Sequence, residues 1–213
     1  MTEAVANLRS DNRRQLILEA AAEVLVAEGY KGASMRDIAK STGMLPGSLY
    51  YHFPSKEALL VAVFEGGVQR ICDCVDRALE TAGRDPWGRL RAASEAHLTM
   101  LLGGSSFAQV VVRVLPRDVP GAEASLVILR DTYEARFRNL VEALPLNRGV
   151  DRSIFRLMLM GAMNHVPVWY RRGGVTAHQL ADQFIGNLKI AHDNPMMSGE
   201  VNRSSDLRET ERE

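Results

Sequence analysis

Polar side chains that could hold a phosphate group gather in one short stretch of the chain, residues 34–59. Hydroxyl groups, a histidine and cations all occur there, and proteins use such groups to contact the backbone of a nucleic acid. Lys56 follows a serine, a residue type that often precedes a helix, so its ammonium would lie beside the exposed amides of a first helical turn. That arrangement favours an anion such as a phosphate oxygen.

The elements that must position these side chains can be read from the same stretch. Met35 and Ile38 share one face of a first short helix, and Gly43 offers the positive φ that a tight turn needs. Leu49 and Phe53 give a second short helix its buried side. This layout predicts a helix-turn-helix, which presents its second helix to the major groove of DNA.

The sequence SLYYHFPSKEALL, residues 48–60, is typical of one group of regulators. Serine, leucine, tyrosine, a further aromatic residue, histidine and phenylalanine follow one another, and a lysine comes three residues after the phenylalanine. On these residues, segment 10–64 resembles the TetR family of one-component transcriptional regulators. The motif covers roughly the first third of the chain, and the rest agrees with the family in length and helical layout.

The resemblance implies contacts with DNA for ten residues of the motif. Some would lie at the start of the first motif helix, some would meet base edges from the second helix, and others would hold the DNA backbone. The full set is Ser34, Arg36, Leu45, Pro46, Gly47, Ser48, Tyr50, Tyr51, His52 and Lys56.

Several of these residues have a purely structural alternative. Ser34 could serve only as a helix N-cap, Arg36 could be a solvated charge, and Tyr50 could belong to the core. His52 is expected to contact phosphate or to pack locally, because no second metal ligand stands at a suitable spacing on its short helix. Readout of base sequence is expected to be sparse, since a residue such as Leu45 offers only apolar contact.

The balance of charge sets a condition on any nucleic-acid partner. Formal net charge is zero, and the first 60 residues contain seven basic and seven acidic residues. Phosphate binding usually accompanies a basic excess, so the charges would have to be segregated by face. Arg9, Arg13 and Arg14 could grip the DNA backbone or could simply be solvated.

Apolar periodicity predicts further helices in the rest of the chain and no strand. The expected helices cover residues 10–28, 55–79, 86 onward, 104–115, 121–143, 151–172 and 176–191. The predicted fold is all-α, with a three-helix helix-turn-helix DNA-binding domain at 1–54. A larger helical domain at 55–194 follows, and the resemblance implies that it binds ligand and dimerises. Residues 195–213 are polar and are expected to form a disordered tail.

The sequence lacks two features that would direct a protein to a membrane or out of the cell. No run of about 18 apolar residues could cross a bilayer, and the first 15 residues lack the apolar core of a signal peptide. A cytoplasmic protein is expected.

Polar residues set within apolar stripes of the C-terminal domain are candidates for effector binding. If buried, His97, Asn164 and His165 need partners, which could be a ligand oxygen or simply core groups. Arg113 could neutralise an acidic ligand or cap the carbonyls of a neighbouring helix, and Pro167 should kink its own helix. The apolar candidates could equally be core fillers. The full set is Phe64, Val68, His97, Met100, Leu101, Phe107, Arg113, Met163, Asn164 and His165.

Residues 168–184 also resemble a TetR sub-branch associated with fatty-acid, sterol or other acyl catabolism, some of whose members respond to CoA thioesters. Together the resemblances imply a ligand-responsive transcriptional regulator, most simply a repressor. It would bind a palindromic operator as a homodimer through its last two helices and be released by a small lipophilic or acyl effector. No cofactor or metal is expected, and no enzyme, because no glycine-rich phosphate loop or catalytic arrangement is recognisable.

Two other functions stay open. Cys72 and Cys74 stand two residues apart on a predicted helix, where their side chains point apart, so a redox- or metal-responsive regulator would need a partner from another helix. Alternatively, the zero net charge could indicate a helical protein-interaction module that does not bind DNA.

Overall fold

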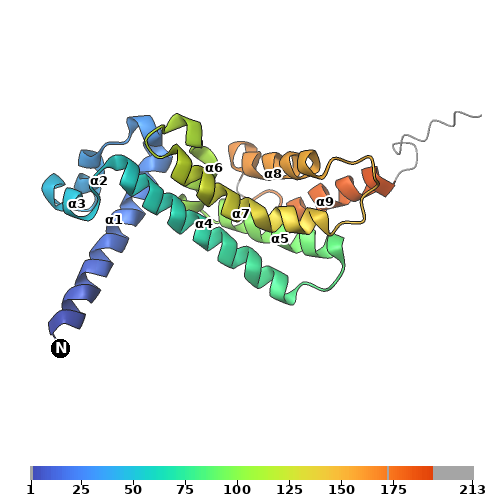
Figure 1. Ribbon diagram of the computed structural model, residues 1–213, viewed down its shortest axis with the longest axis horizontal. Coiled ribbons are helices and arrows are strands. Elements are labelled where there is room, and N and C mark those ends of the chain that lie inside the picture. Colours follow the sequence, from blue (N-terminus) through green and yellow to red (C-terminus); the bar gives the residue numbers. More distant parts are fainter. Residues whose placement is uncertain (1, 172, 194–213) are drawn as a thin grey trace, which may run out of the picture.

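The computed structural model describes the backbone of residues 2–171 and 173–193, and the side chains of 11–171 and 173–191. Throughout this described part the regular structure is helical, with no strand, which confirms the predicted all-α fold. The helix-turn-helix lies at one end of an elongated body, and the last two helices lie at the other end (Figure 1). The predicted tail, residues 195–213, lies outside the described residues.

Helix α1, Thr2–Gly32, begins earlier than expected and projects away from the body (Figure 1). The predicted start near residue 10 was wrong because residues 2–9 contain no glycine or proline and several strong helix formers. The predicted stop is confirmed, since the backbone leaves helical geometry at Gly29 with φ 68° and ψ 168°. One further turn follows Gly29 before the motif begins.

The helix-turn-helix is formed by α2, Met35–Ser41, and α3, Pro46–His52. Ser34 caps α2 by accepting a hydrogen bond from the amide of Asp37 at 3.2 Å, and Gly43 adopts a φ of 65° in the turn. Leu49 and Phe53 are buried, as the sequence predicts. These two anchors fix α3 while its remaining face stays uncovered.

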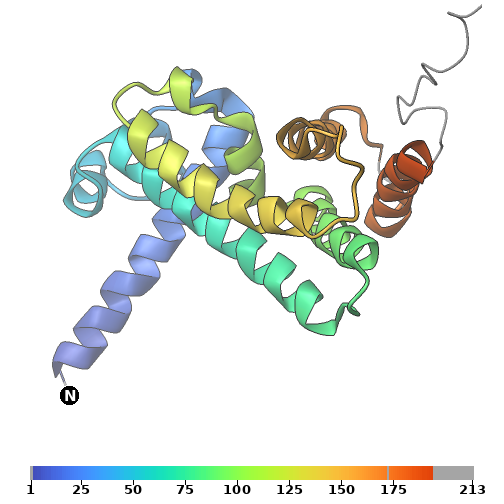
Figure 2. The same ribbon diagram turned by 45° about the vertical axis from the view of Figure 1, so that its right-hand side comes forward.

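Helix α4, Lys56–Thr81, runs from the motif into the middle of the body, where it packs against α1, α5, α6 and α7 (Figures 1 and 2). The partners within the body are α5, Pro86–Leu102; α6, Ser106–Arg113; and α7, Glu123–Glu142, with the short 3-10 helix η1, Pro116–Asp118, before α7. A boundary between domains at 54/55 falls just before α4. It stays a prediction, because α4 contacts helices on both sides of it.

Glycine at position 67 lets α6 approach α4 closely. A Cβ atom at Gly67 would lie 2.5 Å from the carbonyl oxygen of Phe107 and 2.6 Å from Cγ2 of Val111. Both distances are below van der Waals contact, and one of the atoms belongs to the backbone of α6. The α4–α6 contact therefore depends on the absence of a side chain at Gly67.

The last two helices are α8, Arg152–Trp169, and α9, Ala177–Asp193. The predicted end of α8 at residue 172 was wrong, since Tyr170 already has extended backbone and closes the helix with a 2.9 Å bond to the Val166 carbonyl. Pro167 lacks an amide hydrogen, which removes one helical bond from the last turn and favours this early end. At α9 the Thr176 amide donates to the Gln179 side chain at 2.8 Å and the Gln179 amide donates to the Thr176 hydroxyl at 3.1 Å, which forms a capping box.

Charged side chains tie the outer helices to the body. His178 of α9 lies 3.0 Å from Glu95 of α5 and 3.2 Å from Asp182, and Arg91 lies 3.3 Å from both carboxylates. Arg136 of α7 pairs with Asp76 of α4 at 2.7 Å. These half-exposed pairs add specificity to the packing and little stability of their own.

Candidate nucleic-acid interface and effector core

The outer face of α3 carries apolar and aromatic side chains that nothing in the described structure covers. Leu49 is the buried residue of this seven-residue helix, whereas Leu45, just before it, is 76% exposed and Tyr51 is 87% exposed. Pro46, Gly47 and Ser48 are exposed as well. Large exposed apolar groups gathered on one short element indicate a surface that meets a partner.

Two other predicted contacts lie at the start of α2. Ser34 serves as the N-cap, and its hydroxyl donates to the Asp37 carboxylate at 2.5 Å. Its expected phosphate contact remains a prediction. Arg36 is exposed in the first turn of the same helix. An arginine there can reach a partner that approaches the α2–α3 side of the motif.

The aromatic residues at the end of α3 differ in their contacts. Tyr50 is 49% exposed, so it is not the core residue that was the alternative. Tyr51 and His52 meet edge to face with ring centroids 5.5 Å apart, and His52 is half-buried. The contact with Tyr51 accounts for the position of the His52 ring. A contact between His52 and a phosphate stays a prediction.

Cations near α3 rest on aromatic rings. The ammonium of Lys56 lies 4.3 Å from the ring centroid of Tyr30, and the guanidinium carbon of Arg14 lies 5.2 Å from that of Phe53. The Tyr30 hydroxyl donates in turn to the Glu57 carboxylate at 2.6 Å. Sequence reasoning missed Tyr30, and the only available signal was a lone aromatic residue directly after Gly29.

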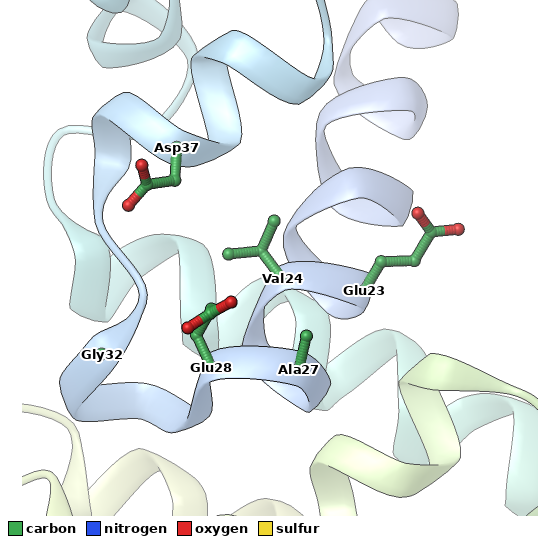
Figure 3. Close-up of a pocket in the computed structure, with 6 residues that line it drawn as sticks. All are labelled: Glu23, Val24, Ala27, Glu28, Gly32 and Asp37. Carbon is green, nitrogen blue, oxygen red and sulfur yellow. The ribbon is translucent and has the colours of Figure 1, made fainter.

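Acidic side chains gather in a depression between α1 and α2 of about 470 Å³. Figure 3 shows Glu23 and Glu28 on α1 and Asp37 on α2 around it. Val24, Ala27 and Gly32 complete the lining. Three of the seven acids of the first 60 residues therefore line one depression.

A polar cluster lies inside the apolar core of the C-terminal half. His97 of α5 is fully buried, with Nδ1 2.7 Å from the Tyr133 hydroxyl and Nε2 3.0 Å from Asn164 Oδ1. An amide oxygen can only accept, so Nε2 carries the proton and Nδ1 accepts from tyrosine. Both ring nitrogens are satisfied by a neutral histidine. Burial lowers the pKa of His97 to about 4, and the bond to Asn164 opposes this shift only in part.

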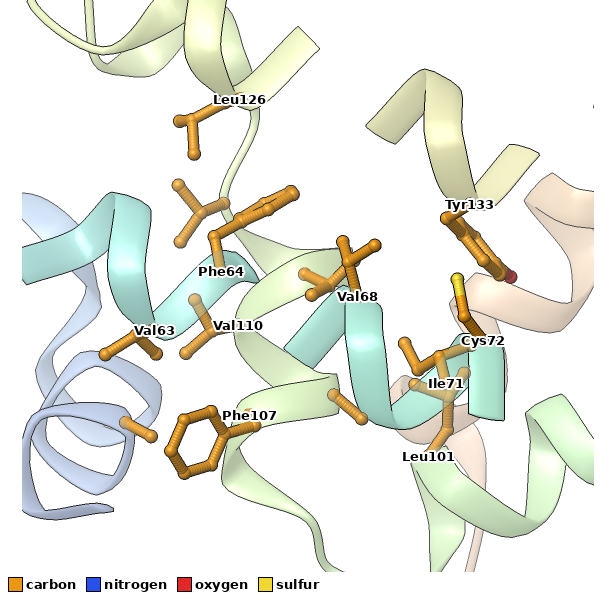
Figure 4. Packing of buried hydrophobic residues seen from close by; sticks show 14 of the residues in the cluster. Val63, Phe64, Val68, Ile71, Cys72, Leu101, Phe107, Val110, Leu126 and Tyr133 are labelled. Carbon is orange, nitrogen blue, oxygen red and sulfur yellow. The ribbon is translucent and has the colours of Figure 1, made fainter. Parts of the chain in front are cut away.

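The cluster continues into the sulfur-containing and aromatic core around it. The Tyr133 ring stacks on His97 with centroids 5.5 Å apart, and its hydroxyl lies 3.9 Å from the Met160 sulfur. Figure 4 shows the Tyr133 ring beside Cys72 of α4. Sequence reasoning missed Tyr133, although its spacing of four from Phe137 in an otherwise charged helix could have indicated a buried face.

The other predicted effector residues divide into buried and exposed groups. Six of the ten are buried in one core: Phe64, Val68, His97, Leu101, Phe107 and Met163. Met100 and Asn164 are half-buried. Arg113 and His165 are exposed, so the structure does not bring them to the buried cluster. Arg113 instead donates to the Val26 carbonyl of α1 at 3.3 Å, which is the capping alternative.

The two depressions described for the surface lie away from His97. The first is the acidic one, and the second, of about 290 Å³, is lined by Leu115, Pro116, Arg117, Glu123 and Arg130. Neither includes a residue of the polar cluster. Because His97 is fully buried, an effector that contacted its side chain would have to displace groups that now cover it.

Comparison with known proteins places this arrangement in a family. The model described as "Bacterial regulatory proteins, tetR family" matches residues 17–63, and "Tetracyclin repressor-like, C-terminal domain" matches 83–188. The HTH-type transcriptional repressor KstR2 of Mycobacterium tuberculosis is 30% identical over 189 residues, which cover 82% of this chain and 90% of KstR2. The chain belongs to the TetR family.

Two further relatives extend the comparison. The transcriptional activator FasR of Mycolicibacterium smegmatis is 44% identical over 89 residues, 42% of this chain and 40% of FasR. AibR, crystallised with isovaleryl coenzyme A and operator DNA, matches with a TM-score of 0.71 at 24% identity, over 82% of this chain and 97% of AibR. As a TetR-family member, the protein is a ligand-responsive DNA-binding regulator.

None of the helices in the described part combines the length and the apolar character that a membrane span needs.

We predict that the buried histidine makes the stability of this TetR-family protein fall in acid. An unfolded His97 takes up a proton near its ordinary pKa of 6.5, whereas the folded one does so only near 4. Between these values the unfolded chain binds more protons, so stability is fully present above about 6.5 and is lost as pH falls towards 4. The free energy of unfolding should drop by up to about 3 kcal/mol over this window.

Urea denaturation at a series of pH values measures this effect, with His97→Gln as the test variant. His97→Gln should flatten the pH dependence, whereas His52→Gln, which lies outside the cluster, should keep it. Equal slopes for His97→Gln and the unmodified protein would contradict the assignment.

Proposed function

We propose that this protein binds a palindromic operator as a homodimer and represses transcription until an effector releases it. The observation that carries the proposal is the uncovered face of α3, where Leu45 and Tyr51 are more than three-quarters exposed beside the exposed Pro46, Gly47 and Ser48. A helix anchored by one buried residue can enter a major groove without losing its packing.

The contacts expected at the groove differ in kind. Leu45 and Pro46 would meet apolar groups such as thymine methyls, while Ser48 can hydrogen-bond a base or a phosphate. Tyr50, Tyr51 and the other flanking residues would hold the backbone on either side. Operator choice would then depend in part on DNA shape and on Arg36.

The dimer is supported by the outer face of α8 and α9. Large apolar side chains of α8, of α9 and of the loop between them are 45–73% exposed: Ile154, Leu157, Met158, Val168, Trp169, Val175 and Ile190. Gly161 and Ala162 lie exposed in the middle of the α8 face, where small residues allow a second helix to approach. A second copy of α8 and α9 would cover this surface as a four-helix bundle.

Two-fold symmetry explains the form of the operator. Paired α3 helices would meet successive major grooves about 34–36 Å apart, which requires two inverted half-sites. Repression is proposed because KstR2, the relative matched over most of the chain, is a repressor. A dimer seated across a promoter blocks polymerase by occupancy alone.

The effector is proposed to be a small lipophilic or acyl compound that enters beside His97. Methionines Met160 and Met163, which re-pack readily, border the polar cluster in an otherwise apolar core. AibR has been crystallised with isovaleryl coenzyme A, which supports an acyl-CoA for this chain as well.

A redox-responsive mechanism has less support. Burial raises the pKa of the Cys72 thiol, which leaves less of the reactive thiolate. Within the described residues, no three histidine, cysteine or carboxylate side chains are placed to hold a metal ion.

We predict that Lys56→Ala weakens binding to the DNA upstream of the protein's own gene. Each lost phosphate contact should cost roughly five- to ten-fold in affinity at 0.1 M salt and lower the salt slope by about one. Fluorescence anisotropy over a salt series measures both quantities. Arg77→Ala, which removes a cation at the far end of α4, is the matched control and should change neither. An unchanged slope for Lys56→Ala would refute its contact with phosphate.

We predict that Leu157→Glu separates the dimer. Leu157 is 55% exposed on α8, and an unpaired carboxylate buried there should cost at least about 2 kcal/mol, or roughly thirty-fold in dimer affinity. Sedimentation equilibrium gives the association constant. Ile128→Glu makes the same change on α7, at a side chain 66% exposed, and should leave the dimer intact. Loss of the dimer in both variants, or in neither, would place the interface elsewhere.

We predict that an acyl-CoA raises the thermal stability of the protein. Ligand at about one hundred times its Kd adds roughly 2.7 kcal/mol to the free energy of unfolding. Isovaleryl-CoA, palmitoyl-CoA, palmitate and free CoA form the panel, and Asn164→Ala should weaken the response, with Asn139→Ala as the exposed control. A shift that free CoA produces equally well, or no shift with any compound, would exclude this effector class.

A further inference from the structure

The chain between α1 and α2 places one tyrosine over the first turn of α4. Gly29, with its φ of 68°, ends the long part of α1 and turns the chain so that Tyr30 reaches α4. The tyrosine ring then holds two consecutive residues of that helix. Its face lies 4.3 Å from the Lys56 ammonium, and its hydroxyl lies 2.6 Å from Glu57 Oε1.

The hydrogen bond to Glu57 fixes the ring. Burial, and then Glu57 itself, raise the pKa of Tyr30 to about 12, so the hydroxyl keeps its proton and donates. The same bond is the main cause that lowers the pKa of Glu57, which stays a carboxylate and accepts. A charged acceptor makes this bond a strong one, and it restrains the ring from swinging away from Lys56.

The ring holds Lys56 in a different way from the other paired cations. Arg91, Arg136, Arg152 and Arg156 each pair with a carboxylate, which offsets their charge. Across residues 11–171 and 173–191, no carboxylate lies within ion-pair distance of Lys56. An aromatic face attracts an ammonium group without neutralising it. Lys56 is therefore held in place with no carboxylate directly paired to it. Its charge helps to lower the pKa of the neighbouring Glu57, but its ammonium is left without an ion-pair partner and can meet an anion.

We propose that Tyr30 is a positioning residue for DNA binding, which holds the Lys56 ammonium where a phosphate of the operator meets the first turn of α4. This inference rests on the proposed DNA-binding function. Without the ring, the four-carbon side chain of lysine would sample many rotamers, and binding would have to order it. Tyr30 itself need not touch the DNA.

A double-mutant cycle on the full-length protein tests the proposal, with upstream DNA as the probe and anisotropy over a salt series as the readout. Tyr30→Leu should weaken binding by roughly two- to five-fold per subunit, the range of one cation–π contact, and should lower the salt slope. Tyr30→Phe keeps the ring and should bind within about two-fold of the unmodified protein. In the Lys56→Ala background, Tyr30→Leu should cause no further loss.

The cycle separates positioning from a merely structural role. A structural tyrosine would weaken binding equally with and without Lys56, and that result would overturn the proposal. Circular dichroism of Tyr30→Leu checks that this variant keeps its helices. If it does not, the DNA affinity of Tyr30→Phe is compared with the affinities of the unmodified protein and of Lys56→Ala. Tyr30→Phe that binds as weakly as Lys56→Ala would also overturn the role of the ring.

A second measurement needs no DNA. In the free protein, the ring should shift the Lys56 side-chain methylene protons upfield in the NMR spectrum. The shift should persist, though reduced, in Tyr30→Phe, which lacks the bond to Glu57, and be absent in Tyr30→Leu. Absence of DNA binding by the unmodified protein would refute the proposed function, while the NMR shift would still decide whether Tyr30 holds Lys56. Absence of that shift in the unmodified protein would overturn the inference alone.

Discussion

The burial of α4 against α1, α5, α6 and α7 holds the motif and the body together. Its closest approach is at Gly67, where a side-chain atom would lie 2.5 Å from the backbone of α6. The same helix begins at Lys56 and passes Cys72, which faces Tyr133 of the polar cluster (Figure 4). One continuous helix thus links the first turn of α4 to the core around His97, and packed interiors tend to rearrange as units.

Two contacts outside the core join the halves at other points. Arg113 of α6 donates to the Val26 carbonyl, which lies in the last turn of α1 before Gly29 breaks its helical bonding. Gly121, just before α7, packs against Glu57, since a Cβ there would lie 3.3 Å from the Glu57 Cγ. Both contacts join elements that follow α5 to the helices α1 and α4, which flank the motif. They give the regulator further points at which a change in the body can bias the position of α3.

Local interactions account for what could be predicted from the sequence. The cap at Ser34 and the turn at Gly43 depend on groups within four residues of each other, and both are confirmed. The bond between Tyr30 and Glu57 spans 27 residues, and the one between His97 and Tyr133 spans 36, so both depend on how the helices pack. No periodicity specifies such a pairing. The spacing of apolar residues along a helix also did not show whether the polar residues Arg113 and His165 within it would be buried. Both are exposed.

The zero net charge is compatible with a DNA partner because the acids and the cations of the motif are placed differently. Glu23, Glu28 and Asp37 surround one depression, and the charge of Glu57 is engaged by the Tyr30 hydroxyl. Lys56, by contrast, lies against a ring and has no carboxylate directly paired with its ammonium. A bound phosphate interacts mainly with the charged side chains closest to it, because charges more than about 10 Å away are largely screened at 0.1 M salt. A few phosphate contacts of this kind would give a modest salt dependence, which a count of charges over the whole chain does not reveal.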